Sequence, residues 1–172
     1  KEEALSKALS IIEKGAVIAS GGSATIEEVG LLNYIKTHSE EYTFIDRSIA
    51  KNEEEKRQIH AKAILSDYYL MSTNAFTMDG QLVNIDGNGN RVSALCYGPK
   101  HVVIITGMNK LTPSVEDAYK RIRQDACPPN CVRLGLPTPC SKTGVCGDCM
   151  SASSICDLFV TTRMSRYPDR IH

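Results

Sequence analysis

The feature that most limits the possible folds is an alternation of short apolar runs with helical segments. Apolar runs of strand length occur around 16–20, 42–46, 68–72 and 101–106. Segments with helix-start residues or with apolar residues at helical spacing lie before, between and after these runs. This alternation is typical of an α/β protein with a mainly parallel sheet. We therefore predict a three-layer fold, with helices on both faces of the sheet, in one domain spanning 1–172.

Local motifs place the remaining elements. A capping box, Thr25-x-x-Glu28, predicts a helix start, and Ser114-x-x-Asp117 predicts another. Asp79-Gly80 predicts a hairpin turn ahead of the apolar run 81–85. The expected helices cover 4–13, 25–35, 52–65 and 114–126, with a short helix or strand at 91–97 and a last strand at 157–162.

Composition excludes some classes of partner. The 172 residues are 42% hydrophobic, which suits one core, and the 20 basic and 20 acidic residues cancel. A neutral chain lacks the basic face that nucleic acid requires, and no apolar run reaches the roughly 18 residues of a membrane helix. The polar start, Lys1-Glu2-Glu3, shows no secretory signal, so we expect a cytoplasmic protein that binds neither nucleic acid nor membranes.

Six of the seven cysteines lie within one short segment, 127–156, where regular periodicity is lost. An odd cysteine count without a secretory signal argues against disulfides and favours metal binding. Thiolates suit zinc and iron–sulfur clusters, and a metal would order a segment with few large apolar side chains. The preferred ligands are Cys140, Cys146, Cys149 and Cys156, while Cys127 and Cys131 are second choices or a redox-active pair.

The cysteine spacing bears on which metal is bound. Structural zinc sites usually have two close cysteine pairs, whereas here only Cys146-x2-Cys149 is close. Looser spacing suits a 4Fe-4S cluster, in which each cysteine binds one iron. An iron–sulfur cluster is the preferred cofactor and zinc is the alternative. The third hypothesis is that the loop holds reduced thiols and binds no metal.

Two groups of polar residues are candidates for ligand binding. Gly21, Gly22, Ser23 and Thr25 lie between a predicted strand and a helix start, where backbone N–H groups favour anions, although a plain tight turn fits equally well. The second group follows predicted strands, where ligands of open parallel sheets bind. Asp86 and Arg91 would act through charge, Asn74 and Asn90 as orienting amides, and Lys110 as a further cation, although turn structure alone accounts for most such residues.

These motifs resemble the LUD domain, the lactate-utilisation protein C family. The likeness runs from about residue 4 to 162, and Asn84–Arg91 is its most specific stretch. It also includes Gly21–Thr25, Asn74-Ala75, Asp79-Gly80, Gly98-Pro99-Lys100 and Gly107–Lys110.

The resemblance implies a fold like the ribose-5-phosphate isomerase and CoA-transferase superfamily. It places Gly21, Gly22, Ser23 and Thr25 on one side of a ligand pocket, and Asn74, Asp86, Gly89, Asn90 and Arg91 on the other. Protein C members act with iron–sulfur partners in oxidising L-lactate and usually lack a full cysteine set. This chain instead resembles a stand-alone, cysteine-rich subgroup.

Three functions follow as hypotheses. The first is an iron–sulfur redox protein or oxidoreductase component that acts on or senses a small carboxylate or phosphorylated metabolite. The second is a metabolite-binding or isomerase-like domain with structural zinc. The third is a non-catalytic subunit of an iron–sulfur oxidoreductase. The sequence leaves open whether the chain is an enzyme and whether it forms a homo-oligomer.

Overall fold

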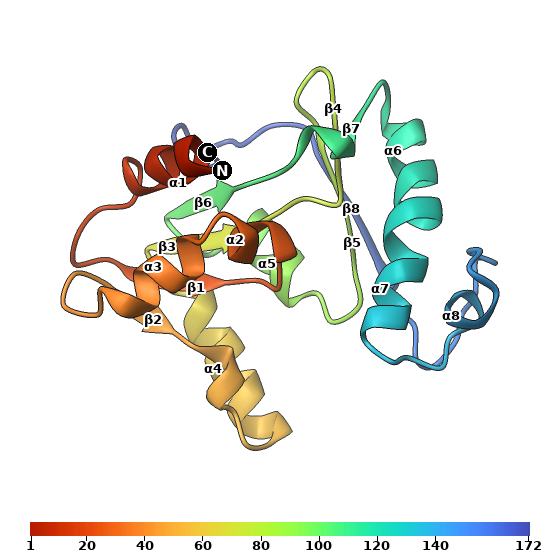
Figure 1. Ribbon diagram of the computed structural model, residues 1–172, viewed down its shortest axis with the longest axis horizontal. Coiled ribbons are helices and arrows are strands. Elements are labelled where there is room, and N and C mark those ends of the chain that lie inside the picture. Colours follow the sequence, from red (N-terminus) through yellow and green to blue (C-terminus); the bar gives the residue numbers. More distant parts are fainter. The chain divides into compact units, whose positions relative to one another are not determined.

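The computed structural model describes all of residues 1–172 and confirms the α/β class, with strands in two separate sheets (Figure 1). Unit 1 comprises Lys1–Ser72, Ser93–Thr106 and Ser165–His172, and unit 2 comprises Thr73–Val92 and Gly107–Met164. The elements are α1 (Glu2–Leu9), β1 (Val17–Ser20), α2 (Ala24–Glu28), α3 (Leu31–Thr37), β2 (Thr43–Ile45), α4 (Glu53–Ile64), β3 (Tyr68–Met71), β4 (Ala75–Thr77), β5 (Leu82–Asp86), α5 (Asn90–Cys96), β6 (His101–Ile104), β7 (Leu111–Thr112), α6 (Val115–Arg121), α7 (Cys127–Arg133), α8 (Pro139–Thr143) and β8 (Leu158–Thr162).

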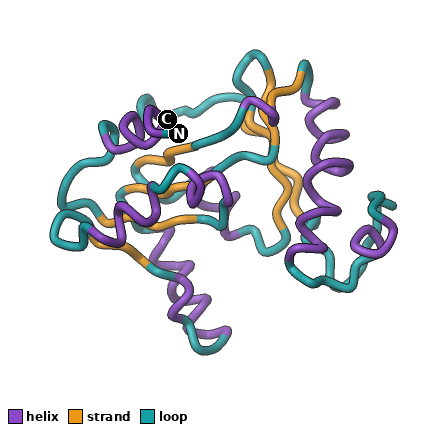
Figure 2. The backbone as a smooth tube through the Cα atoms, in the orientation of Figure 1, coloured by secondary structure: helices purple, strands orange, loops and turns teal.

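Unit 1 contains an entirely parallel sheet in the order β2-β1-β3-β6. Its strands coincide with the four apolar runs that the sequence predicted. Ile18 of β1 lies opposite Tyr68 of β3, and Met71 of β3 lies opposite Ile104 of β6. Because parallel neighbours require crossover connections, the helices between the strands cover the sheet (Figure 2).

Alternate side chains of this sheet enter different cores. Ile18, Leu70 and Val103 pack in one cluster with apolar residues of α1, α2 and α3. Their neighbours Ala19, Tyr69 and Val102 are also buried but point to the opposite face, since successive side chains of a strand alternate. α4 packs against β1 and β2. The three-layer prediction therefore describes unit 1.

The predicted helices of unit 1 differ from the structure at three points. The N-cap of α2 is Ser23, whose hydroxyl accepts from the Ile26 N–H at 3.4 Å, and not Thr25 of the expected capping box. Gly30, at φ 79°, then divides the expected helix 25–35 into α2 and α3, since a left-handed residue interrupts helical backbone. α1 also ends at Leu9, before the expected residue 13, where Ser10 donates its hydroxyl to the Lys7 carbonyl at 2.7 Å.

Unit 2 contains a mixed sheet in the order β7-β4-β5-β8. The Asp79-Gly80 turn joins β4 and β5 as the predicted antiparallel hairpin, with Gly80 at φ 84°. β8 pairs antiparallel with β5 along its whole length. One mainly parallel sheet was therefore too simple a prediction, because the hairpin reverses the chain and starts a second sheet.

The helical part of unit 2 extends further than predicted. α6 begins at the predicted cap, where the Ser114 hydroxyl accepts from the Asp117 N–H at 3.1 Å. A π-helical turn, Ile122–Ala126, then leads directly into α7, although we expected irregular structure from Cys127. Pro128 and Pro129 are tolerated because they occupy the first turn of α7, where N–H groups need no intrahelical partner. Residues of α6 and Cys127 pack on Val83 and Ile85 of β5.

No helix of the chain has the length and apolar character needed to cross a membrane.

Candidate functional site

The first glycine turn belongs to unit 1, and part of it is already used by the fold. The Gly21 N–H donates to the Leu70 carbonyl at 2.9 Å, which extends the pairing of β1 with β3. Ser23 caps α2. Gly22 is exposed, so of the predicted group it offers the most accessible backbone.

Arg47 lies beside this turn, although it was not among the predicted site residues. A Cβ placed on Gly22 would come within 2.6 Å of an Arg47 guanidinium nitrogen. Glycine therefore permits close approach of a cation to the turn. Its position directly after the predicted strand 42–46 is the signal that could have identified it, since ligands of parallel sheets bind beyond the carboxyl ends of strands.

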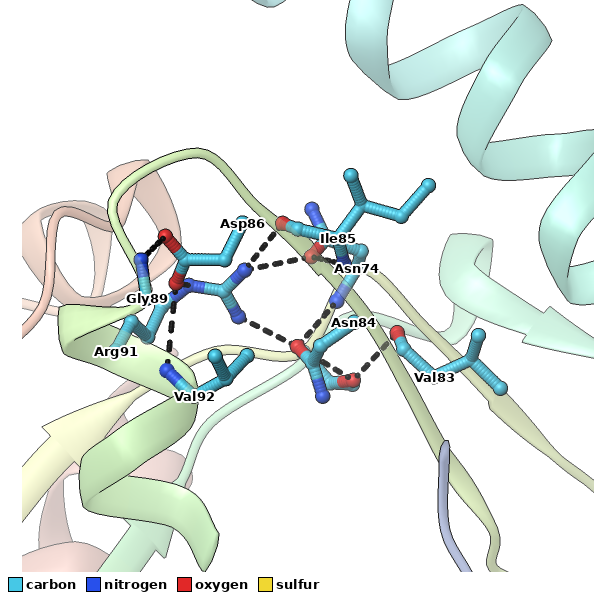
Figure 3. Close-up of polar contacts among 9 residues, drawn as sticks. Asn74, Val83, Asn84, Ile85, Asp86, Gly89, Arg91 and Val92 are labelled. Atoms are coloured by element: carbon cyan, nitrogen blue, oxygen red, sulfur yellow. Dashed lines mark hydrogen bonds and ion pairs between the residues drawn. The ribbon is translucent and has the colours of Figure 1, made fainter. Parts of the chain in front are cut away.

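In unit 2, Arg91 connects the hairpin to the start of α5 (Figure 3). Its guanidinium donates to Asn84 Oδ1, to Asn74 Oδ1 at 2.8 Å and to the Ile85 carbonyl at 2.7 Å. Its Nε lies 3.6 Å from Asp86 Oδ2, with the two side chains 14% and 9% exposed. This pair is therefore largely shielded from solvent.

Asp86 also organises the loop before α5. Its carboxylate accepts from the N–H of Gly89 at 3.0 Å and from the N–H of Val92 at 3.3 Å. Gly89 adopts φ 81°, which favours glycine, and an added Cβ there would lie 2.8 Å from Leu158 Cδ1. Asn90 is the first residue of α5.

Asn84 is the centre of this network, although it was not among the predicted site residues. It is fully buried, and its Oδ1 accepts from Arg91, from the Thr73 hydroxyl and from the Asn74 N–H. Its Nδ2 is buried without a hydrogen-bond partner. A carboxamide inside the apolar strand Leu82–Asp86 was the pattern that could have identified it.

Two further cations hold the segment before β4. Lys110 Nζ donates to the Thr73 carbonyl at 3.1 Å. Arg121 donates to the Asn74 carbonyl at 2.8 Å and to the Asn109 carbonyl at 3.0 Å. With Arg91, three positive charges surround this short segment, and Asp86 supplies one negative charge. The local excess of positive charge would favour an anion.

The predicted ligand residues thus separate into two sets. Asn74, Asp86, Gly89 and Arg91 share one network in unit 2, and Lys110 binds the residue next to Asn74. Gly21, Gly22, Ser23 and Thr25 belong to unit 1. The network in unit 2 uses many of its polar groups to hold the chain itself.

All six clustered cysteines lie in unit 2 and all are free thiols. Cys127, Cys131 and Cys140 are 5%, 1% and 6% exposed, whereas Cys146, Cys149 and Cys156 are half-buried. Cys96 is a separate, exposed thiol in unit 1.

Two pairs of these thiols are close enough to influence each other's pKa, Cys127 with Cys156 and Cys131 with Cys140. Cys127 donates to Cys156, which lowers the pKa of Cys156 to about 7. The same bond and burial raise the pKa of Cys127, so the proton stays on Cys127. Burial is the main cause that raises the pKa of Cys131.

This arrangement differs from the predicted ligand set. Cys140 and Cys156 each interact with a second-choice cysteine, Cys131 and Cys127 respectively. No three side chains among His, Cys, Asp and Glu are placed as they stand to hold one metal ion. The donor chemistry fits a soft metal, but Cys140, Cys146, Cys149 and Cys156 do not converge as a preformed site.

Comparison with protein families identifies a match over the whole chain. The family model described as the LUD domain matches residues 1–172. None of the curated proteins compared with the chain matches it.

Among solved structures, the chain is similar to ribose 5-phosphate isomerase from Plasmodium falciparum, with 15% identity and a TM-score of 0.41 over 64% of this chain. It spans about half of that enzyme, 51%. It is also similar to ribose 5-phosphate isomerase A from Methanocaldococcus jannaschii, with 16% identity, a TM-score of 0.41, and 82% and 65% of the two chains covered. A third similar structure is eIF2B delta from Chaetomium thermophilum, with 12% identity, a TM-score of 0.43, and 67% and 49% covered.

Proposed function

The chain belongs to the LUD domain family, and we propose that it is an iron–sulfur-binding redox protein or oxidoreductase component. It would act on or sense a small carboxylate or phosphorylated metabolite. Lactate utilisation is one process in which such a protein would take part. Within the family, we assign it to a cysteine-rich, stand-alone subgroup.

The grouping of free thiols in unit 2 carries this proposal. Four of them form two pairs in which at least one partner is buried. Thiols are soft donors, which suit iron–sulfur clusters and zinc. Since thiolates are the ligating form, the pKa of Cys156 near 7 also favours binding at neutral pH.

The surrounding segment gives a second reason to expect a metal. Beyond α8 the chain has no regular element before β8, and Val145 and Met150 are exposed. Such a segment has few packed apolar side chains to fix its conformation. Metal binding would supply that ordering free energy.

Anaerobic purification with iron, sulfide and zinc analysis tests the proposal. Iron and inorganic sulfide in comparable amounts, with a visible absorption band that disappears on oxidation, would support an iron–sulfur centre. Stoichiometric zinc would instead support a metabolite-binding or isomerase-like domain with a structural metal. Protein that binds neither metal, even after reconstitution, would refute the proposed function.

The anionic metabolite is supported by Arg47 beside the glycine turn of unit 1. A guanidinium next to the exposed Gly22 suits a carboxylate or phosphate. Calorimetric titration with L-lactate and with inorganic phosphate tests this binding. Arg47→Gln should weaken it about tenfold, as expected for loss of one charge-assisted hydrogen bond, whereas Arg57→Gln on α4 serves as a control. Equal affinities for both variants would exclude Arg47 from the site.

A non-catalytic role beside an iron–sulfur oxidoreductase is the remaining alternative. It would be supported by co-purification with such a partner and by a lack of turnover in isolation. Cytoplasmic location and homo-oligomer formation remain predictions, tested by fractionation and by mass measurement in solution.

A further inference from the structure

We infer that two copies of the chain associate along the free edge of β8. The two β8 strands pair antiparallel, centred on Val160, so that the mixed sheet of unit 2 continues from one copy into the other. This inference goes beyond the proposed function and does not depend on a bound metal.

Strand β8 is open on one side. Its hydrogen-bonded neighbour is β5, and the sheet ends with β8 in the order β7-β4-β5-β8 (Figure 1). In an antiparallel ladder, alternate residues direct their N–H and C=O groups away from the neighbouring strand. Because β8 is 5 residues long, several of its backbone groups face outward and can pair with a further strand.

The other sheet edges are less suited to such pairing. β7 has 2 residues and β2 has 3. The edge of β6 is already occupied, since the Val102 N–H donates to the Arg170 carbonyl at 2.7 Å and the Ile104 N–H donates to the His172 carbonyl at 2.9 Å. β8 is longer than β2 or β7, and its sequence contains no proline, glycine or charged residue of the kind that protects edge strands.

Apolar side chains are exposed along this edge. Leu158 is 42% exposed and Phe159 is 44% exposed. The Phe159 ring lies 5.7 Å from the ring of Tyr119 on α6, so Leu158 points to the other face of the sheet, because successive side chains of a strand alternate. A strand added beside β8 would cover part of both side chains, and this burial favours association.

Opposite charges flank β8 at its two ends. Asp157 directly precedes the strand and Arg163 directly follows it, and both are exposed. Six residues of extended chain span roughly 20 Å, so these two side chains cannot reach each other within one copy. A second strand that runs antiparallel to β8 brings the complementary charge to each end.

The charges favour one pairing of two copies. A two-fold dimer uses the same surface on both copies. Antiparallel pairing centred on Val160 places Asp157 opposite the partner's Arg163, and Arg163 opposite the partner's Asp157. Parallel pairing in register would place like charges opposite each other, which destabilises a strand pair.

Charge reversal tests the pairing in the full chain. Sedimentation equilibrium over a concentration series measures the Kd of the dimer. Asp157→Arg should raise it at least about tenfold, because each dimer then contains two arginine pairs in place of two opposite-charge pairs. Combining Asp157→Arg with Arg163→Asp exchanges the charges and should restore most of the affinity. Arg166→Asp is the matched control, since Arg166 is also exposed but lies outside β8, and it should leave the Kd unchanged.

A cross-link tests the register. The two copies of Val160 would lie directly opposite each other, with Cα atoms about 4.5–5.5 Å apart, which is within the range that a disulfide spans. Mild oxidation of Val160→Cys should therefore link the introduced thiols of two copies, as identified by peptide mass spectrometry. Leu158→Cys is the control, because its two copies would lie about four residues, or roughly 13 Å, apart along the strands and should not link.

The outcomes decide the inference independently of the proposed function. Wild-type protein that stays monomeric up to about 1 mM would overturn it, since any weaker association contributes almost no binding free energy. A dimer that responds equally to Asp157→Arg and Arg166→Asp, without the Val160→Cys link, would also overturn it, because the interface would then lie elsewhere. Metal analysis of the same samples tests the proposed function, so a dimer without metal or a monomer with metal would show which of the two proposals fails.

Discussion

The two units are stabilised in different ways. Unit 1 has an all-parallel sheet whose apolar side chains pack against helices, and its buried polar side chains are Ser66, Ser72 and Arg170. Unit 2 has a smaller apolar core and adds an internally bonded Arg91–Asp86 pair and buried thiols. The comparison indicates that unit 1 is a scaffold fixed by hydrophobic burial, whereas unit 2 depends on specific polar partners and is the region where a bound metal would matter.

Leu70→Ala should have the largest effect on stability. Leu70 is fully buried in the core of unit 1, and removing its side chain leaves a cavity that costs about 2–5 kcal/mol. Residue-resolved hydrogen exchange and chemical denaturation measure the loss. We expect amides of β1 and β3 to lose more protection than amides of β5 and β8. Equal losses of amide protection in both sheets would show that the two units unfold together. The stability of unit 1 would then not be independent of unit 2.

Arg91→Met tests the polar part of unit 2. The substitution leaves Asp86 shielded without its cation and removes donors from Asn74 and Asn84. We expect a cost of about 3 kcal/mol, since an uncompensated buried charge is strongly destabilising. Denaturant unfolding measures it.

Arg123→Met is the matched control for that variant. Arg123 pairs with Asp148 at 2.8 Å, but the side chains are 38% and 72% exposed, so the cost should stay below about 1 kcal/mol. If the two variants lost the same stability, the Arg91 network would be no more important than a surface pair.

Periodicity predicted unit 1 better than unit 2. The four parallel strands follow from apolar runs such as Tyr68–Met71, because a strand buried on both faces needs a continuous apolar run. The helix break at Gly30 was missed because a positive φ depends on tertiary structure, and glycine within an apolar pattern is compatible with a helix. Ser23 was missed as a cap because Thr25-x-x-Glu28 also fits the capping pattern.

The candidate site shows where sequence reasoning stops. Asp86 and Arg91 could be selected because charged residues are rare beside a buried strand, and the structure pairs them. The pairing of Cys127 with Cys156 could not be predicted, since it depends on how α6, α7 and β8 pack on β5. Spacing selected Cys140, Cys146, Cys149 and Cys156, because sequence separation alone does not show that Cys127 and Cys131 lie one helical turn apart on α7.

Thr138→Val tests whether the start of helix α8 controls access to the Cys140 thiol in unit 2. The Thr138 hydroxyl accepts from the Ser141 N–H at 3.3 Å as the cap of α8 and lies 3.3 Å from the Cys140 sulfur. Loss of the cap should cost about 1 kcal/mol and increase the alkylation rate of Cys140. Ser114→Ala removes the cap of α6 in the same unit at a similar cost and should leave Cys140 unchanged. An unchanged Cys140 rate in Thr138→Val would show that α8 does not control access to that thiol.

Asp46→Asn should have the smallest effect, confined to unit 1 and dependent on pH. Hydrogen bonds from Lys36 and Ser48 lower the pKa of Asp46 to about 2, below the roughly 3.9 of an unfolded chain. Because the folded pKa is the lower one, the carboxylate stabilises the fold above about pH 4 and this contribution is lost as pH falls toward 2. The Lys36 pair is near the surface, so we expect a difference of up to about 1 kcal/mol between wild type and variant at neutral pH.

Unfolding measured across pH tests this, with added salt as the control. The two stability curves should converge near pH 2 and separate above pH 4, and salt at about 1 M should reduce the separation because it screens the pair. Hydrogen exchange should locate the change in β2, next to Asp46, and not in β5. A pH-independent difference would mean that the Asn side chain perturbs packing, because electrostatic stabilisation by Lys36 must disappear when the carboxylate is protonated.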